Sequence, residues 1–268
     1  MKHGSLFSGI GGFDLAAEWM GWENVFHCEW EKFPRKVLKY YWPKAISYGD
    51  ITKTDFTIHR GNIDILTGGF PCQDASMAMQ HGGGQTGLEG DRTGLWTHMV
   101  RAIREIRPGY VIAENVENIL RTNNGRDFRT ILSELDGLGY NAEWRVTRAS
   151  EVGACHQRAR CYLVGYTSSI RLQERESFFA NVEKEVIQGR RWVNGTTGTV
   201  GVSWPNQPPV SWLDDGIPEW MAQTSFRGWK HKAIKGYGNA ITPQVALQIF
   251  KAIQYANKAI HTARQAQH

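Results

Sequence analysis

Short apolar runs and longer amphipathic stretches alternate from the start of the chain to Tyr166. Runs of strand length end at Leu6-Phe7 and fill residues 25–28, 46–48, 63–67, 110–113, 142–147 and 160–165. Between them, apolar residues recur at helical spacing over residues 13–20, 32–41, 94–106 and 128–138. This order of strands and helices predicts an α/β protein with a doubly wound, mainly parallel sheet.

The pattern changes after Tyr166. Residues 167–236 show weak periodicity and contain several prolines and tryptophans, so we expect a small irregular subdomain there. A helix is predicted again from Thr242, with an apolar stripe formed by Val245, Ile249, Ala252, Ile253 and Ala256. The predicted organisation is therefore a first domain over residues 1–166, the subdomain over 167–236 and a last segment over 237–268.

Composition sets only broad limits on the size, partners and location of the protein. A chain of 268 residues is long enough for one large domain and a small one, and its net charge of +5 fits a polyanionic partner mildly. Its four cysteines form no CxxC pair, so neither a zinc site nor a disulfide framework is expected. With no signal peptide and no apolar stretch of spanning length, we expect a cytoplasmic protein without membrane contact.

A glycine-rich turn follows the first predicted strand and opens the first helix. It reads Ser8-Gly9-Ile10-Gly11-Gly12, and such glycines let the backbone and the helix N–H groups approach a ligand. The spacing is not GxGxxG, so a dinucleotide pyrophosphate is not indicated. Alone, the turn is as easily structural as ligand-binding.

Two further strand ends carry polar groups suited to a nucleoside. Glu29 ends the second strand and can accept from ribose hydroxyls, while Trp30 beside it can stack on a purine. Asp50 ends the third strand, where it can accept from an exocyclic amine. A solvated charge and a core aromatic are the plain alternatives, but the three strand ends together favour a nucleoside site.

Cys72 follows the fourth predicted strand in Gly68-Gly69-Phe70-Pro71-Cys72-Gln73. Such a turn exposes a thiol at the carboxyl end of a sheet, where open α/β proteins bind ligands. Taken by itself, a cysteine of this kind is more often a packed small hydrophobe than a nucleophile.

Several short motifs, taken in order, give the chain its resemblance to a known family. They are Leu6-Phe7-Ser8-Gly9-Ile10-Gly11-Gly12, Glu29-Trp30, Gly49-Asp50-Ile51, Gly69-Phe70-Pro71-Cys72-Gln73, Glu114-Asn115-Val116, Arg158-Ala159-Arg160 and Gly238-Asn239-Ala240. Their order and spacing resemble the DNA (cytosine-5)-methyltransferases, which use S-adenosylmethionine. The resemblance covers roughly residues 3–165 and 236–260, and it implies a class I, Rossmann-like catalytic domain with residues 167–236 as a target-recognition subdomain.

The chain departs from the family pattern at two places. Ser5 precedes Leu6, whereas the first motif usually begins Asp-Leu-Phe, and His156 takes the place of Gln in a motif that usually reads Gln-x-Arg-x-Arg. We expect both changes to be tolerated because neither residue touches the reacting atoms.

The resemblance implies catalytic roles for Cys72, Glu114, Asn115, Arg158 and Arg160. Cys72 would add to carbon 6 of cytosine, and Glu114 would contact ring N3 and the exocyclic amine, with burial raising its pKa. Arg160 would donate to the base O2 and hold Glu114, Arg158 would support the same wall, and Asn115 would orient the loop. On sequence alone, Glu114 is as easily a solvated strand-end acid.

The same resemblance implies S-adenosylmethionine as the cofactor, with S-adenosylhomocysteine as its product, and no metal. The residues expected to contact the cofactor are Phe7, Ser8, Gly9, Ile10, Gly11, Gly12, Glu29, Trp30, Asp50, Ile51, Gly69, Pro71, Leu95, Asn239, Ala240 and Ile241. Residues 237–268 would return to the catalytic domain.

Double-stranded DNA is the implied partner of a monomeric enzyme. A base inside a duplex cannot be reached by a thiol on the protein, so the target cytosine would be flipped out. The glycine-rich stretch 73–93 suits a loop that closes over it, although a plain linker is the alternative.

Two other functions compete with this reading. The tRNA-modifying branch of the family typically has Pro-Pro-Cys-Gln, whereas this chain has Phe70-Pro71-Cys72-Gln73, which favours DNA. A catalytically inactive DNA-binding relative would be expected to lack Cys72, Glu114 or Arg160, and all three are present. The target sequence is not readable from the chain.

Overall fold

A seven-stranded sheet with helices on both faces forms the described part of the protein. The structure is a computed structural model that describes residues 1–71, 94–154, 156–167, 179, 235–236 and 238–265, with side chains described up to Asn257. The strand order is β3-β2-β1-β4-β5-β7-β6. Strands β1 to β5 are parallel to one another, and β7 runs antiparallel to both β5 and β6.

The elements follow in the alternating order that the apolar pattern predicts. The strands are β1 (Lys2–Leu6), β2 (Glu23–Cys28), β3 (Ile46–Tyr48), β4 (Ile65–Gly69), β5 (Tyr110–Val116), β6 (Tyr140–Arg148) and β7 (Ala159–Thr167). The α-helices are α1 (Gly12–Trp19), α2 (Lys32–Tyr41), α3 (Leu95–Ile106), α4 (Arg126–Gly137) and α8 (Pro243–Gln265), with short 3₁₀ turns between several of them. The doubly wound, mainly parallel sheet is therefore confirmed.

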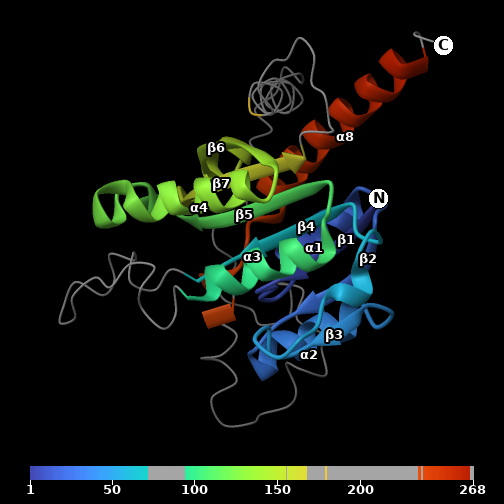
Figure 1. Cartoon of the computed structure of the whole chain (residues 1–268). Coiled ribbons are helices and arrows are strands. Elements are labelled where there is room, and N and C mark those ends of the chain that lie inside the picture. The colour runs from blue at the N-terminus through green and yellow to red at the C-terminus, as the bar shows by residue number, and fades with distance from the viewer. Residues whose placement is uncertain (72–93, 155, 168–178, 180–234, 237, 266–268) are drawn as a thin grey trace, which may run out of the picture.

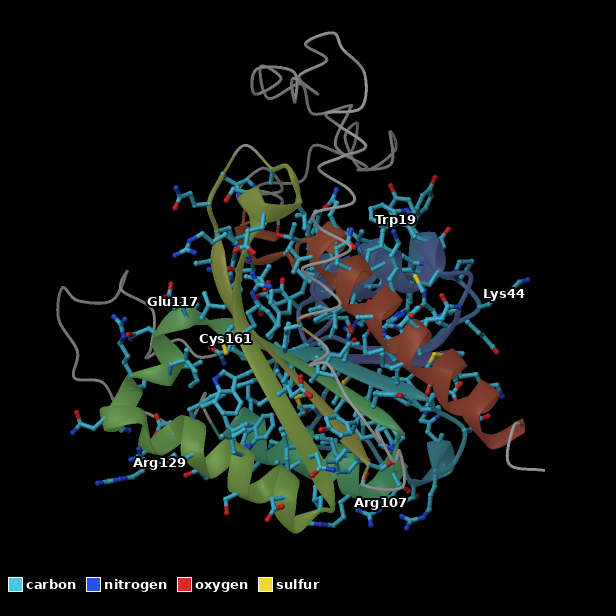
Figure 2. The ribbon with its side chains drawn as sticks, turned by 90° about the horizontal axis from the view of Figure 1, so that it is seen from above. Trp19, Lys44, Arg107, Glu117, Arg129 and Cys161 are labelled. Atoms are coloured by element: carbon cyan, nitrogen blue, oxygen red, sulfur yellow. The ribbon has the colours of Figure 1, made fainter. Side chains whose placement is uncertain are left out.

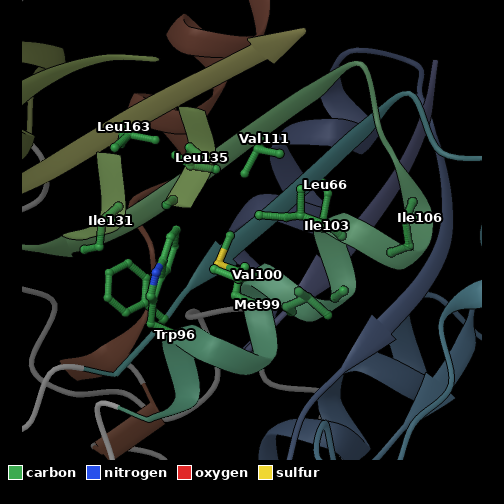
Figure 3. Close-up of a cluster of buried hydrophobic side chains, with 14 of the residues drawn as sticks. Leu66, Trp96, Met99, Val100, Ile103, Ile106, Val111, Ile131, Leu135 and Leu163 are labelled. Atoms are coloured by element: carbon green, nitrogen blue, oxygen red, sulfur yellow. The ribbon is translucent and has the colours of Figure 1, made fainter. Parts of the chain in front are cut away.

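Each face of the sheet has its own apolar core. On one face, α3 and α4 pack over the central strands, and side chains of α3 such as Met99 and Ile103 point toward Leu66 and Val111 (Figure 3). On the other face, α1 and α8 pack against each other and against β4, β5 and β7. Figure 1 shows the sheet between these layers, and Figure 2 shows α4 and α8 on opposite sides of the strands.

Several strands run longer than predicted, and two of the differences bear on the site. The fourth strand was expected over residues 63–67 but spans 65–69, so Gly68 and Gly69 are strand residues and not part of a turn. They stay in the ladder because Leu6 pairs with Gly68 and Glu114 pairs with Gly69. Pairing with neighbouring strands thus outweighs the low strand preference of glycine.

The fifth strand also runs further than expected. It was predicted to end at Glu114 but continues to Val116, because Glu114 pairs with Tyr162 and Val116 pairs with Arg160 on β7. Glu114 is therefore inside a strand that has neighbours on both sides. This placement buries its side chain, which a position at the free end of a strand would not do.

The winding direction of the sheet reverses at the carboxyl ends of β1 and β4. The chain moves outward from β1 to β3 on one side of the sheet and from β4 to β5 on the other. In open α/β sheets, ligands bind where the winding direction reverses in this way. The glycine-rich turn after β1 and the Phe70-Pro71 segment after β4 both lie at this point.

The predicted target-recognition subdomain lies almost wholly outside the described residues, as do the stretch 73–93 and Cys72. Phe179 is described and is buried in the α1–α8 core. Among the described residues, no helix is long and apolar enough to cross a membrane.

A buried carboxyl group lies under the first turn of α1. Asp14 is fully buried, and its Oδ1 accepts a hydrogen bond from the Ser5 hydroxyl at 2.9 Å. The Ser5 oxygen lies 2.7 Å from the Ser8 hydroxyl, whereas Asp14 Oδ2 has no partner among the described residues. Burial raises the pKa of Asp14 from 3.8 to about 7.

This pKa shift predicts a pH-dependent stability. The folded protein keeps a proton on Asp14 that the unfolded chain releases from about pH 4 upward, so stability is lost as the pH rises through about 7. Asp14→Asn cannot ionise. Its unfolding free energy relative to wild type should therefore increase by about 2 kcal/mol between pH 5 and pH 8.

Thermal or urea unfolding at the two pH values measures this difference. Asp136→Asn, on the exposed surface of α4, is the matched control and should differ from wild type by the same amount at both. If the difference in unfolding free energy between Asp14→Asn and wild type does not change with pH, the raised pKa of Asp14 is contradicted.

Candidate functional site

The glycine-rich turn holds an unusual backbone conformation between β1 and α1. Phe7 has a φ of 50°, which is uncommon for a residue with a side chain, and Gly11 has a φ of 92°. A Cβ at Gly11 would lie 2.3 Å from the Trp42 ring, so this position requires glycine both for its conformation and for space. Trp42 is held in turn by a 2.8 Å hydrogen bond from its Nε1 to Glu18.

Glu29 links the end of β2 to this turn. Its Oε2 accepts a hydrogen bond from the Gly9 N–H at 2.8 Å, and its Oε1 accepts one from the Glu31 N–H at 2.7 Å. Burial raises the pKa of the Glu29 carboxyl, while these two hydrogen bonds act in the opposite direction. Each carboxylate oxygen has a second lone pair, so the group remains able to accept from a ligand hydroxyl.

Trp30, next to Glu29, is 70% exposed. It therefore presents its ring to solvent just after the carboxyl end of β2 and is not a core aromatic. An exposed ring in this position is available for stacking.

The third strand end has only local polar contacts among the described residues. Asp50 accepts from the Thr52 N–H and hydroxyl and forms a 3.6 Å ion pair with Lys53, so its polar contacts are local. These hydrogen bonds, led by the one from the Thr52 side chain, lower the pKa of Asp50. Ile51 is buried in the core, and Leu95 packs against the same core from the start of α3.

A segment from the far end of the sequence lies across this edge of the sheet. We call residues 235–236 and 238–241, just before α8, the return segment. A Cβ at Gly12 would lie 2.4 Å from the Ile241 carbonyl oxygen, and one at Gly69 would lie 3.1 Å from the Ile241 side chain. The return segment therefore packs directly on the glycine turn and on the end of β4, and glycines at both places permit that approach.

Glu114 and Arg160 form an ion pair on the face of the sheet that α8 covers. Glu114 pairs with Tyr162 across the β5–β7 ladder, and Arg160 is two residues from Tyr162, so the two side chains are diagonal neighbours on one face. Arg160 Nε lies 3.1 Å from Glu114 Oε1. Only 10% of the Glu114 side chain and 23% of the Arg160 side chain are exposed.

The electrostatics of Glu114 reflect this burial. Burial raises the pKa of its carboxyl, and the charges of Arg160 and Arg158 act in the opposite direction without cancelling the effect. The direction agrees with the expectation from the sequence. A carboxyl in this state can hold or share a proton nearer to neutral pH than an exposed glutamic acid.

Asn115 connects β5 to the segment after β4. Its amide Nδ2 donates to the Phe70 carbonyl at 3.1 Å, and its Oδ1 accepts from the Val116 N–H at 2.8 Å. Phe70 is two residues before Cys72. Asn115 therefore fixes the backbone from which Cys72 follows, although Cys72 itself lies outside the described residues.

Arg158 is hydrogen-bonded to the return segment. Its two terminal nitrogens donate to the carbonyl oxygens of Gly238 and Ala240, each at 2.7 Å. The predicted role was support of the wall around Glu114. The observed hydrogen bonds go to backbone before α8, and the charge of Arg158 also acts on Glu114.

The structure brings together most of the predicted site residues that it describes. The glycine turn, Glu29, Gly69, Glu114, Arg160 and Ile241 all lie at one edge of the sheet, whereas Ile51 and Leu95 belong to the core. Sequence reasoning missed three contributors: Asp14, Trp42 and Lys235, whose Nζ forms a 2.6 Å ion pair with Glu31. Of these three, only Asp14 had a signal in the sequence. Ser5 departs from the usual first motif, and the Ser5 hydroxyl is the group that donates to Asp14.

Among the described residues, no group of three or more His, Cys, Asp or Glu side chains could hold a metal ion.

The strand order, with the glycine turn at the point where the winding direction reverses, defines a Rossmann-like α/β protein of the class I methyltransferase type. The family model described as C-5 cytosine-specific DNA methylase matches residues 1–198, which is more than half of the chain. The chain therefore belongs to this family.

Two curated relatives illustrate the similarity. The chain is 32% identical over 185 residues to the type II methyltransferase M.Sau3AI of Staphylococcus aureus, a match that covers 62% of this chain and 43% of the relative. It is 33% identical over 172 residues to M.HhaI of Haemophilus parahaemolyticus, covering 63% and 50%. The chain thus spans about half the length of the curated relatives it matches.

Solved structures share the fold. One, described as a DNA modification methyltransferase encoded within an E. coli prophage, has a TM-score of 0.64 at 17% identity and covers 96% of this chain and 99% of its own. The Dnmt2 methyltransferase of S. pombe has a TM-score of 0.54 at 16% identity and covers 69% of this chain and 54% of its own.

Because Gly12 packs closely on Ile241, a larger residue at position 12 should weaken the binding of S-adenosylmethionine. Gly12→Ala would push its Cβ against the Ile241 carbonyl and displace the return segment from the glycine turn. We expect affinity for S-adenosylmethionine, measured by titration calorimetry, to fall by about tenfold or more. Gly137→Ala at the end of α4, where a Cβ would meet no atom within 4 Å, is the control and should bind as wild type. Equal affinities for both variants would contradict the packing argument.

Proposed function

We propose that the protein transfers a methyl group from S-adenosylmethionine to carbon 5 of a cytosine in a specific double-stranded DNA sequence. The observation that carries this proposal is the buried Glu114–Arg160 ion pair, 3.1 Å apart, beside the strand that leads to Cys72. A carboxyl and a guanidinium side by side suit a cytosine, whose N3 and O2 are adjacent acceptors and whose amine is a donor.

The glycine turn and Glu29 fit the cofactor. The N–H groups at the start of α1 suit the polar end of S-adenosylmethionine. The glycines let the backbone approach closely, and a Cβ at Gly12 would instead meet Ile241. Glu29 is positioned by Gly9 to accept from ribose hydroxyls, and Trp30 is free to stack on the purine. Phe7, Ser8, Ile10, Gly11, Asp50, Pro71, Asn239 and Ala240 remain proposed contacts.

Cytosine needs activation before carbon 5 can react. In the proposed reaction the Cys72 thiolate adds to carbon 6, which opens the 5,6 double bond and makes carbon 5 nucleophilic. Glu114 shares a proton with N3 as the thiolate adds, so that negative charge does not build up on the ring, and Arg160 donates to O2. Bound S-adenosylmethionine supplies the methyl group to carbon 5. A base then removes the carbon 5 proton, the double bond re-forms and Cys72 leaves as the thiolate.

The remaining parts of the chain complete the proposal. A duplex base must be flipped out to meet Cys72, and residues 73–93 are proposed to close over it. Residues 1–166 would form the catalytic domain, 167–236 would recognise the target, and 237–268 would return to the catalytic domain. The net charge of +5 is compatible with a DNA partner. We further propose a cytoplasmic monomer.

Transfer of tritium from labelled S-adenosylmethionine tests this function. The acceptors are a long duplex amplified in vitro, in which every cytosine is unmethylated, and bulk tRNA. We expect label in the duplex and none in tRNA. Label in tRNA with none in any DNA would overturn the DNA assignment and favour the tRNA-modifying alternative.

Two cysteine variants locate the nucleophile. Cys72→Ala should abolish transfer, because no other group is proposed to attack carbon 6, while Cys155→Ala should retain it. Equal losses in the two variants would count against Cys72.

Glu114→Gln tests the role of the buried carboxyl. Glutamine keeps the shape but cannot share a proton with N3, so we expect kcat to fall by about 100-fold or more while the affinity for S-adenosylmethionine is unchanged. Glu117→Gln, three residues further along, is the matched control and should retain near wild-type kcat. Unchanged kcat in Glu114→Gln would remove that carboxyl from the mechanism.

A further inference from the structure

Arg158 makes two hydrogen bonds across a sequence separation of about 80 residues. Its Nη1 donates to the Gly238 carbonyl and its Nη2 to the Ala240 carbonyl, each at 2.7 Å. A planar guanidinium is the side chain whose geometry can serve two acceptors at once. Arg158 has a φ of 22°, an uncommon backbone conformation for a residue with a side chain, at the point where the chain enters β7.

The return segment that Arg158 binds also contacts the glycine turn, the segment after β2 and the end of β4. A Cβ at Gly236 would lie 3.2 Å from Ile10 of the glycine turn, and Lys235 pairs with Glu31 beside Glu29. At its other end, Ile241 packs on Gly12 and Gly69. The Arg158 hydrogen bonds fall between these two ends.

Arg158 also lies close to the Glu114–Arg160 pair, where the cytosine is proposed to bind. It is two residues from Arg160, which pairs with Glu114, and its charge lowers the pKa of Glu114 against the larger effect of burial. The Arg158 side chain is half-buried, and its Nε is buried without a partner among the described residues. Its two terminal nitrogens are already directed at carbonyl oxygens of the return segment.

We propose that Arg158 is a positioning residue that fastens the return segment to β7, so that the cofactor side of the site is held in register with the Glu114–Arg160 pair. This role rests on the proposed function, and it differs from contact with the base. Without the two hydrogen bonds, the return segment would separate more often from the glycine turn, and cofactor binding would weaken more than the chemical step.

Three variants of the full chain test the proposal. Arg158→Ala removes both hydrogen bonds, and Arg158→Lys keeps the charge but can donate to only one carbonyl in the same geometry. Arg129→Ala is the matched control, because the Arg129 guanidinium also donates to a backbone carbonyl, that of Asn124 at 3.3 Å, but on α4 and away from α8 (Figure 2).

Hydrogen exchange of the amides from Gly238 to Ala246 measures the attachment directly. We expect exchange about tenfold faster in Arg158→Ala than in wild type, an intermediate rate in Arg158→Lys, and no change in Arg129→Ala. If Arg158→Ala does not fold, Arg158→Lys alone decides the result. Exchange at the wild-type rate in the folded Arg158 variants would overturn the proposal.

Kinetics separate positioning from base contact. We expect KM for S-adenosylmethionine to rise by about tenfold in Arg158→Ala, with kcat reduced much less, and Arg158→Lys to recover part of the loss. A fall in kcat with unchanged KM would overturn the proposal and assign Arg158 to the base. Should the wild type methylate no nucleic acid, the proposed function fails, whereas exchange and calorimetric binding of S-adenosylmethionine still decide the role of Arg158.

Discussion

The burial of one carboxyl group organises the site. Glu114 lies inside β5 between two paired strands, so its charge is stable there only with a cationic partner. The antiparallel run of β7 supplies that partner, because it brings Arg160 to the diagonal position on the same face. Removing Arg160 would leave a buried, unpaired carboxyl. The departure of β7 from the parallel order is therefore what gives this edge of the sheet a polar pair.

The second constraint is close approach of backbone to backbone. Glycines at positions 12 and 69 let the return segment lie directly on the glycine turn and on the end of β4. Arg158, the residue before β7 and two residues from Arg160, holds that segment by two hydrogen bonds. The return segment and the Glu114–Arg160 pair are thus joined through the short stretch from Arg158 to Arg160.

The sequence predicted most of the fold because strand and helix periods alternate clearly through residue 166. It misjudged Gly68-Gly69 as a turn and ended β5 at Glu114, since pairing with β1 and β7 is not visible in local composition. The resemblance to a family anticipated the Glu114–Arg160 contact. Asp14 and the carbonyl contacts of Arg158 were out of reach, because both depend on which distant residues the fold brings together.

The most direct test of the account is a covalent trap on DNA. A long duplex amplified with 5-fluorocytosine in place of cytosine contains every possible target, and fluorine at carbon 5 cannot be removed as a proton is. The reaction should therefore stop after methyl transfer with the protein still attached to carbon 6. Mass spectrometry of the digested complex should find the modified, methylated base on Cys72. Methyl transfer to ordinary DNA without any trapped adduct, or an adduct on Cys28 or Cys161, would contradict the account.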